Sequence, residues 1–131
     1  MEIRETMSPT RRLLGATTLM SDDVYNQNDE KLGDIKEFML DVPSETVSYA
    51  VLSFGGFLGM DEKLFAVPWG ALTLDRENKR FVLNGSVERF KEAPGFDKDH
   101  WPDMADPSWE KIVHTYYGTQ SDAVKASVPP M

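Results

Sequence analysis

Residues 47–54 constrain the fold more than any other part of the chain, because they have the pattern of a β-strand with two apolar faces. Successive side chains of a strand point to opposite faces. One face would carry Val47, Tyr49, Val51 and Ser53, and the other Ala50, Leu52 and Phe54. A strand that is largely apolar on both faces needs protein on either side of it. We therefore expect this strand to lie at the centre of a sheet.

Short segments of strand-forming residues, separated by turns, surround the central strand. We expect strands at residues 16–20, 24–25, 35–40, 63–67, 72–74 and 80–84. Residues 26–29, Asn-Gln-Asn-Asp, have turn chemistry, because Asn and Asp tolerate left-handed backbone and cap it. Residues 75–79 would close a hairpin, and residues 86–92 favour a short helical turn. Short strands at this spacing are typical of a small barrel or sandwich, since closure removes exposed sheet edges.

The pattern changes to a helical period near the end of the chain. Asp106 is a good N-cap and Pro107 suits the first helical position, which predicts a helix over residues 106–117. Its apolar stripe comprises Trp109, Ile112, Val113, Tyr116 and Tyr117. Gly118 lies where a left-handed C-terminal cap is expected. We expect the stripe to pack on the barrel and His114, at the border of the polar face, to lie exposed.

Length and composition predict one globular domain with one core. The chain has 131 residues, of which 40% are hydrophobic and 27% charged. Residues 1–12 are polar and predict a flexible lead, and residues 119–131 are small and polar and predict a disordered tail. The domain itself would span residues 13–118.

The charge and the residue content exclude several classes of function. The 14 basic and 22 acidic residues give a formal net charge of −8, so we expect no binding to nucleic acid. The chain has no cysteine, which excludes disulfides and zinc–thiolate sites. It shows neither a secretory apolar run nor a stretch long enough to span a membrane. We therefore expect a cytoplasmic protein without membrane insertion.

Three segments resemble those of bacterial stand-alone PRC-barrel proteins, over about residues 13–118 in all. They are residues 24–35, with VYN followed by EKLGDI; residues 49–69, with YAVLSFGGFLG followed by EKLFAVPW; and residues 93–104, APGFDKDHWPDM. The resemblance implies a small β-barrel with the C-terminal helix packed on it. It also implies an adaptor or assembly module with no known catalytic residues.

The same family includes the cytoplasmic domain of the photosynthetic reaction-centre H subunit and the C-terminal domain of the ribosome maturation factor RimM. This sequence lacks the transmembrane helix of the first and the N-terminal domain of the second, so neither specific role carries over. The usual glycine of the first turn is also absent, and Asn28 and Asp29 stand in its place.

The loop after the central strand is apolar where a hairpin tip should be polar. It contains Gly55, Gly56, Phe57, Leu58 and Met60. One interpretation is a partner-binding or homodimer surface, joined by an exposed strand edge at residues 63–67. The other is a plug that folds back to close the end of the barrel. The sequence leaves both open.

An acidic loop could hold a hard cation through Asp97, Asp99 and Asp103, with His100 nearby. It does not meet the EF-hand pattern, because Pro102 occupies the position that needs glycine. The alternative is a solvated turn with capped backbone. This loop carries the second hypothesis for function, a regulator that binds a small ligand or a divalent cation.

No motif of a nucleophile, cofactor or metalloenzyme occurs in the sequence, so we expect no catalytic residues, no enzyme activity and no cofactor. Trp69 and Trp101 could stack on a ligand, but the pattern favours core or barrel-cap positions for both. The first hypothesis for function is therefore a non-catalytic protein–protein interaction or assembly module, homodimeric or bound to a protein partner.

Overall fold

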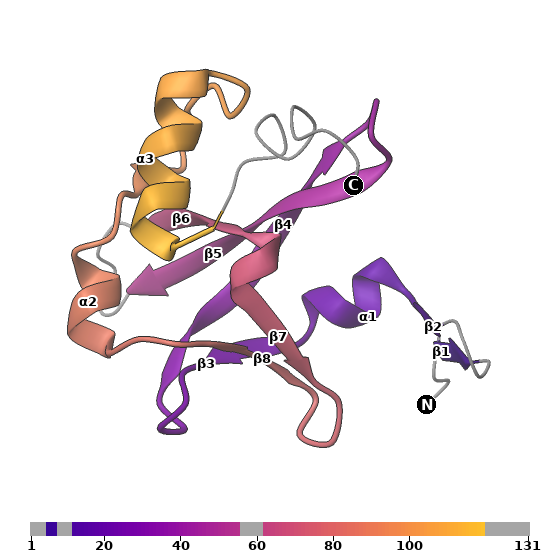
Figure 1. Ribbon diagram of the computed structural model, residues 1–131. Helices are drawn as coiled ribbons and strands as arrows, with labels where there is room; N and C mark the ends of the chain where they lie inside the picture. Colours follow the sequence, from indigo (N-terminus) through magenta and orange to yellow (C-terminus); the bar gives the residue numbers. More distant parts are fainter. Residues whose placement is uncertain (1–4, 8–11, 56–61, 120–131) are drawn as a thin grey trace.

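The computed structural model describes residues 5–7, 12–55 and 62–119, and its main body is a seven-stranded sheet (Figure 1). The order is β7-β8-β3-β4-β5-β6-β9. These strands are β3 (Asp23–Tyr25), β4 (Lys31–Asp41), β5 (Thr46–Gly55), β6 (Glu62–Pro68), β7 (Leu72–Asp75), β8 (Arg80–Leu83) and β9 (Phe96–Asp97). A separate two-stranded sheet pairs β1 (Glu5–Met7) with β2 (Arg12–Leu14). The helices are α1 (Ala16–Met20), the 3-10 turn η2 (Trp69–Ala71), α2 (Val87–Lys91) and α3 (Pro107–Tyr117).

The central position of β5 confirms the prediction made from its two apolar faces. It pairs with β4 on one side and with β6 on the other, both antiparallel. Ala50 and Leu52 point into the main core, which also contains Phe65 and Phe81. Tyr49 points to the opposite face, where it packs in a second cluster with Ala66 and Val113. The chain is therefore mainly β with a C-terminal helix.

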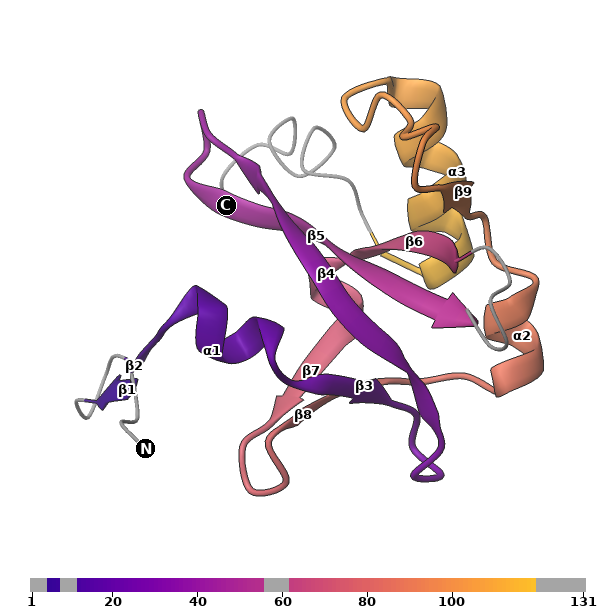
Figure 2. The ribbon, with the colours of Figure 1, turned by 180° about the vertical axis from the view of Figure 1, so that it is seen from behind.

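The sheet is open, which corrects the expectation of a closed barrel. Among the described residues, the edge strands β7 and β9 each pair with one neighbour only. The two-residue strand β9, which the sequence did not predict, is too short to carry a ladder round to β7. Helical side chains complete the main core instead: Phe90 of α2 is buried in it, and Tyr116 and Tyr117 of α3 pack against it. Both helices lie on the opposite side of the molecule from α1 (Figures 1 and 2).

Residues 16–20 form the helix α1, so the predicted first strand is wrong. The N–H of Leu19 donates to the carbonyl of Gly15 at 3.0 Å, which closes one helical turn. Leu19 and Met20 both pack against the main core. Adjacent residues of a strand point to opposite faces, whereas one helical turn can bring both toward the same core. The contact of these two partly buried side chains with the core thus outweighs the strand preference of Thr17 and Thr18.

The C-terminal helix α3 has the predicted bounds and caps. The Asp106 side chain accepts a hydrogen bond from the N–H of Ser108 at 2.9 Å. Gly118 ends the helix in the left-handed conformation, with φ of 70°. The short helical turn is confirmed as well: Ser86 caps α2 by accepting from the N–H of Arg89 at 3.0 Å.

The buried face of α3 differs from the predicted stripe at two residues. Ile112 is 59% exposed, whereas His114 is only 8% exposed, so both predictions are wrong. Burial of the imidazole is compensated by hydrogen bonds: its Nε2 lies 2.9 Å from the hydroxyl of Tyr49, and its Nδ1 lies 2.7 Å from that of Thr119. The helix therefore turns the side of Val113 and His114, instead of that of Ile112, toward the second cluster.

The first turn is organised by Asn26, which is 1% exposed. Its Oδ1 accepts from the N–H groups of Asn28 and Glu30, at 3.0 and 2.9 Å. Its Nδ2 donates to a carboxylate oxygen of Glu30 and to the carbonyl of Gly85. Asp29 adopts the left-handed φ of 63° that a glycine would otherwise supply. The loss of the usual glycine is therefore accommodated without losing the turn.

Candidate functional site

The predicted partner-binding loop lies almost entirely outside the described residues. Gly56, Phe57, Leu58 and Met60 fall in the segment 56–61, and Gly55 is the last residue of β5, opposite Glu62 of β6. The choice between an interface and a plug therefore stays a prediction.

The strand edge that would have extended this surface is not exposed. Within residues 63–67 only Lys63 is exposed, while Phe65 and Val67 are fully buried. Ala66 packs in the second cluster with Val113 of α3, so the helix covers this part of β6. This part of the prediction is wrong, because it did not place the helix beside β6.

The acidic loop does not assemble the predicted cation site. Among the described His, Asp and Glu residues, no group of three or more is placed to hold a metal ion. Asp97 belongs to β9 and its Oδ2 lies 3.8 Å from Nδ1 of His100, while Asp99 lies in the following turn. Asp103 accepts a hydrogen bond from the N–H of Ala105 at 3.0 Å. These contacts agree with the alternative of a solvated, capped turn.

The two tryptophans differ in their environment. Trp69 packs edge-on against Phe38 and Phe81, with ring centroids 5.6 and 5.8 Å apart, so its predicted core position is confirmed. Trp101 is 43% exposed and touches Phe96 at a centroid distance of 5.1 Å. The predicted core or cap position is therefore wrong for Trp101, which packs against Phe96 of β9 but stays partly exposed.

Two large apolar side chains are exposed at the far end of the β4–β5 hairpin. Leu40 is 65% and Val42 is 76% exposed. The hairpin extends away from α2 and α3, and its end stands clear of the sheet body in both ribbon views (Figures 1 and 2). Paired apolar side chains on a projecting element are a feature of contact surfaces.

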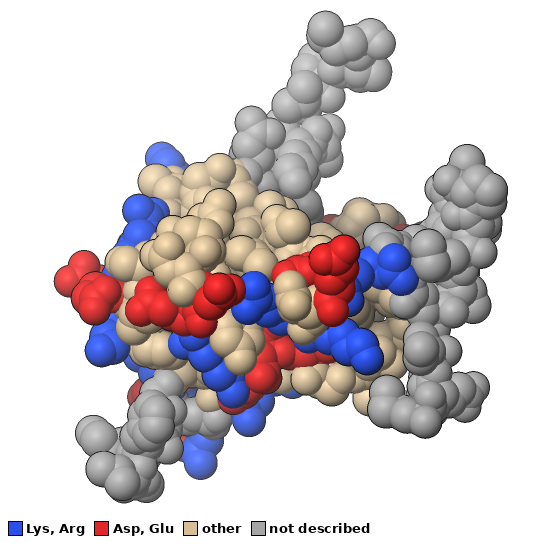
Figure 3. All heavy atoms as spheres, turned by 90° about the horizontal axis from the view of Figure 1, so that it is seen from below, with Lys and Arg blue, Asp and Glu red and all other residues tan. Residues whose placement is uncertain are grey.

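The face seen in Figure 3 carries charges of both signs side by side. Lys31 lies 3.5 Å from a carboxylate oxygen of Asp23 and 3.1 Å from one of Asp34. Arg80 lies 2.6 Å from a carboxylate oxygen of Asp29 and stacks over the ring of Tyr25. In both clusters the cation is matched by two carboxylates, because Arg80 also lies 3.4 Å from Asp75.

The pKa values of the neighbouring carboxyls of Asp23 and Asp34 shift in opposite directions. Burial, followed by the hydrogen bond with Asp34, raises the pKa of Asp23. Burial would also raise the pKa of Asp34, but hydrogen bonds from Asp23 and Lys31 outweigh it and lower that pKa. All three side chains are about half exposed, so the cluster is a solvated ion network rather than an enclosed acid–base pair.

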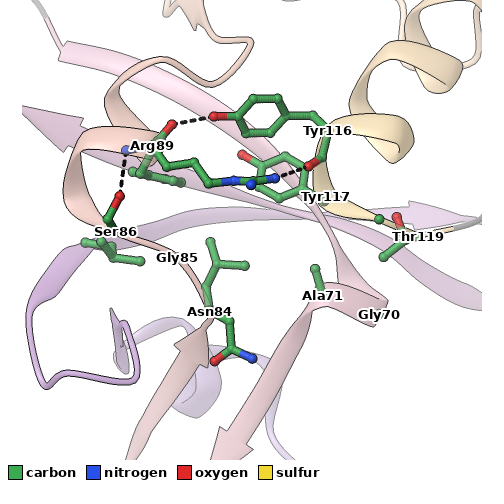
Figure 4. A pocket seen from close by; sticks show the side chains of 13 residues that line it. Gly70, Ala71, Asn84, Gly85, Ser86, Arg89, Tyr116, Tyr117 and Thr119 are labelled. Carbon is green, nitrogen blue, oxygen red and sulfur yellow. Dashed lines mark hydrogen bonds between the residues drawn. The ribbon is translucent and has the colours of Figure 1, made fainter.

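A cavity of about 220 Å³ lies between α2 and the C-terminal end of α3, and we call it the α2–α3 cavity. The end of β8 and η2 complete its walls (Figure 4). Residues of these elements and their caps line it together with Leu32 of β4, among them Ala71, Leu83, Ser86, Arg89, Tyr117 and Gly118.

Arg89 joins the two helices across this cavity. Its Nη2 donates to the backbone carbonyl of Tyr116 at 2.7 Å, and its guanidinium stacks over the Tyr116 ring at 4.9 Å from the centroid. The Tyr116 hydroxyl donates in return to the backbone carbonyl of Arg89. Figure 4 shows this side chain running along one wall, from the Ser86 end toward the two tyrosines.

Tyr117 carries a buried hydroxyl that has no hydrogen-bond partner among the residues described. Burial raises the pKa of this hydroxyl strongly, the neighbouring Tyr116 adds to the rise, and Arg89 offsets part of it. The group therefore stays protonated and able to donate at physiological pH.

The sequence did not predict this cavity, because its walls come from segments far apart in the chain. Arg89 and Lys91 form a basic cluster in the sequence, and Tyr116 and Tyr117 belong to the helical stripe. No spacing rule connects the two segments. They meet only because α3 folds back beside α2.

None of the described helices is long and apolar enough to cross a membrane. No curated protein matches the chain. Residues 13–89, which are more than half of the 131, match the PRC-barrel domain. The match covers β2 to the middle of α2 and includes two of the three segments that suggested the resemblance. The chain therefore belongs to the PRC-barrel family.

Proposed function

We propose that the chain is a non-catalytic protein-interaction module that forms a homodimer. Its family is that of small β-rich modules. The observation that carries the proposal is the apolar end of the β4–β5 hairpin, where Leu40 and Val42 are both more than half exposed. A second copy of the chain is the partner that this surface fits best, because an isologous contact would cover the same two side chains on both copies.

The charge distribution supports an apolar contact at this end of the molecule. The chain carries a formal net charge of −8, so two copies repel each other, and a contact made by apolar side chains adds the least to this repulsion. The same turn carries two carboxylates: Asp41, which accepts a hydrogen bond from the hydroxyl of Ser44 at 2.7 Å, and the exposed Glu45. Burial of the apolar side chains would then supply most of the binding free energy.

Light scattering coupled to size-exclusion chromatography tests the proposal on the full chain. We expect the wild type to be a dimer and the double variant Leu40→Asp/Val42→Asp to be a monomer. Two desolvated carboxylates at the contact should weaken self-association by at least about tenfold. The control is Ile112→Asp, which makes the same kind of change at an exposed site on α3 and should leave the dimer intact.

A second variant separates the two surfaces that could form the dimer. Phe57→Asp/Leu58→Asp changes the loop for which the sequence leaves an interface and a barrel plug both open. If this variant dissociates the dimer and the hairpin variant does not, the contact belongs to the loop and the hairpin assignment is wrong. A wild type that stays monomeric at high concentration contradicts the homodimer itself.

A further inference from the structure

We propose that the α2–α3 cavity binds a small organic carboxylate, held by Arg89 and Tyr117. The site lies where the segment that matches the PRC-barrel domain, which ends at Arg89, meets the helix α3 beyond it. It is separate from the hairpin surface on which the homodimer proposal rests.

The charge of the cavity differs from that of the chain. Of the 131 residues, 22 are acidic and 14 basic, yet the described residues that line the cavity include one cation, Arg89, and no Asp or Glu. A guanidinium attracts an anionic ligand when the described wall around it offers no carboxylate to compete for its donors. The ligand is therefore expected to carry a negative charge.

The guanidinium has donors to spare. Among the described residues, the Arg89 side chain donates one hydrogen bond, from Nη2 to the backbone carbonyl of Tyr116. A guanidinium carries five N–H donors in a planar fork. Stacking on the Tyr116 ring fixes the plane of this fork without using its remaining donors. A carboxylate matches such a fork with two parallel hydrogen bonds.

The Tyr117 hydroxyl provides a second donor beside the first. It is buried and has no hydrogen-bond partner within the described part of the chain, which costs free energy unless a further group satisfies it. Tyr117 and Arg89 both line the α2–α3 cavity, and Figure 4 shows the Tyr117 ring beside the Arg89 side chain, so the two donors belong to one site. An oxyanion that accepts from both would relieve the unsatisfied hydroxyl and neutralise the cation.

The rest of the lining indicates an apolar body for the ligand. Leu32, Leu83 and Phe90 contribute to the walls, and all three belong to the main core. A volume of about 220 Å³ is below the range of pockets for drug-sized molecules, so it fits a compact metabolite. A small aromatic or branched aliphatic acid meets both conditions, whereas inorganic phosphate would leave the apolar wall uncovered.

Nuclear magnetic resonance titration of the full chain tests the site, with benzoate as the probe. Benzamide, which has the same shape without the charge, and inorganic phosphate, which has charge without the apolar body, are the comparison probes. We expect benzoate to shift the backbone amide signals of Ser86, Arg89 and Gly118. Its affinity should exceed that of either comparison probe by about tenfold, the effect of one charge-assisted hydrogen bond.

Three variants assign the binding to the proposed residues. Arg89→Gln should weaken benzoate binding by about tenfold, and Tyr117→Phe, which keeps the ring, should weaken it several-fold. Lys91→Gln removes an exposed cation from the same helix outside the cavity and should leave the affinity unchanged. Because Arg89 also ties α2 to α3, the amide spectrum of each free variant must first show that α3 is still folded.

Several outcomes would overturn the proposal. Equal binding of benzoate and benzamide would show that the cavity does not select the charge. Binding of phosphate but not benzoate would remove the carboxylate assignment. An unchanged affinity in Tyr117→Phe together with Arg89→Gln, or no response to benzoate in the millimolar range, would place no ligand in this cavity.

Discussion

Gly33 lies where β4 passes from its pairing with β3 to its pairing with β5, and it allows the two backbones to approach closely. A Cβ atom at this position would lie 2.3 Å from the carbonyl oxygen of Ser53. Because that oxygen belongs to the backbone of the central strand, it cannot move away without breaking the ladder. We expect Gly33→Ala to destabilise the protein by about 4 kcal/mol or more, measured by chemical denaturation.

The matched control is Gly70→Ala in η2. There the nearest atom to an added Cβ is the methyl group of Thr119, at 4.0 Å, so the substitution meets no obstacle. Its effect on the free energy of unfolding should stay below about 1 kcal/mol. If both variants lose a similar free energy of unfolding, the close approach of the Ser53 carbonyl is not the reason why position 33 needs glycine.

Single residues also show where prediction from the sequence stops. The helical period placed Trp109, Val113, Tyr116 and Tyr117 on one stripe. It could not show whether the buried face extends toward Ile112 or toward His114. The choice depends on the Tyr49 hydroxyl, which lies 2.9 Å from Nε2 of His114 and so allows the imidazole to be buried. The two residues are 65 positions apart in the sequence. Such a partner is visible only once β5 and α3 lie together.

Elements with a strong repeating pattern were predictable, and short ones were not. Both apolar faces of β5 and the caps of α3 are encoded by residues close together in the chain. The helix α1 has one turn and β9 has two residues, so neither has enough length to show a period. Their conformation is set by tertiary contacts: the core beneath Leu19 and Met20, and the edge of β6 beside Phe96.

The β7–β8 hairpin depends on an ionised Asp75. The side chain of Asn78 donates a hydrogen bond to this carboxylate at 2.8 Å, and Arg80 lies 3.4 Å from it. These hydrogen bonds, that of Asn78 first, hold the pKa of Asp75 below its ordinary value of 3.8. The unfolded chain therefore takes up the proton first as the pH falls, so the contribution of Asp75 to stability is present above the ordinary pKa and is lost below it.

We expect the melting temperature of the wild type to exceed that of Asp75→Asn near neutral pH, and the difference to shrink as the pH falls toward about 3. Thermal melts of both proteins across this range measure the effect. Comparing the two proteins removes the opposite contributions of Asp22 and Asp23, whose pKa values are raised. Thr73→Ala, an exposed and non-titrating change in the same hairpin, should give a difference that does not vary with pH. A constant difference for Asp75→Asn would contradict the role of its charge.

At the scale of the whole molecule, the open sheet makes α3 part of the core rather than an attachment to it. Val113 is 1% exposed and packs with Tyr49 and Ala66, while Tyr116 and Tyr117 cover the main core. A sheet whose edge strands do not meet leaves apolar side chains that only the helix shields from water. Removal of the helix contacts should therefore weaken the sheet as well, and the two should unfold as one cooperative unit.

Native-state hydrogen exchange separates this expectation from its alternative. In the wild type, amides of α3 and of β5 should exchange with the same free energy of opening. Val113→Ala should lower both by about 2 kcal/mol, because it leaves a cavity in the shared core, whereas the neighbouring Ile112→Ala, at an exposed site, should lower neither by more than about 0.5 kcal/mol. If α3 amides exchange through a smaller opening that leaves β5 protected, the helix is an appendage, and the α2–α3 cavity would then be a site that forms and dissolves with it.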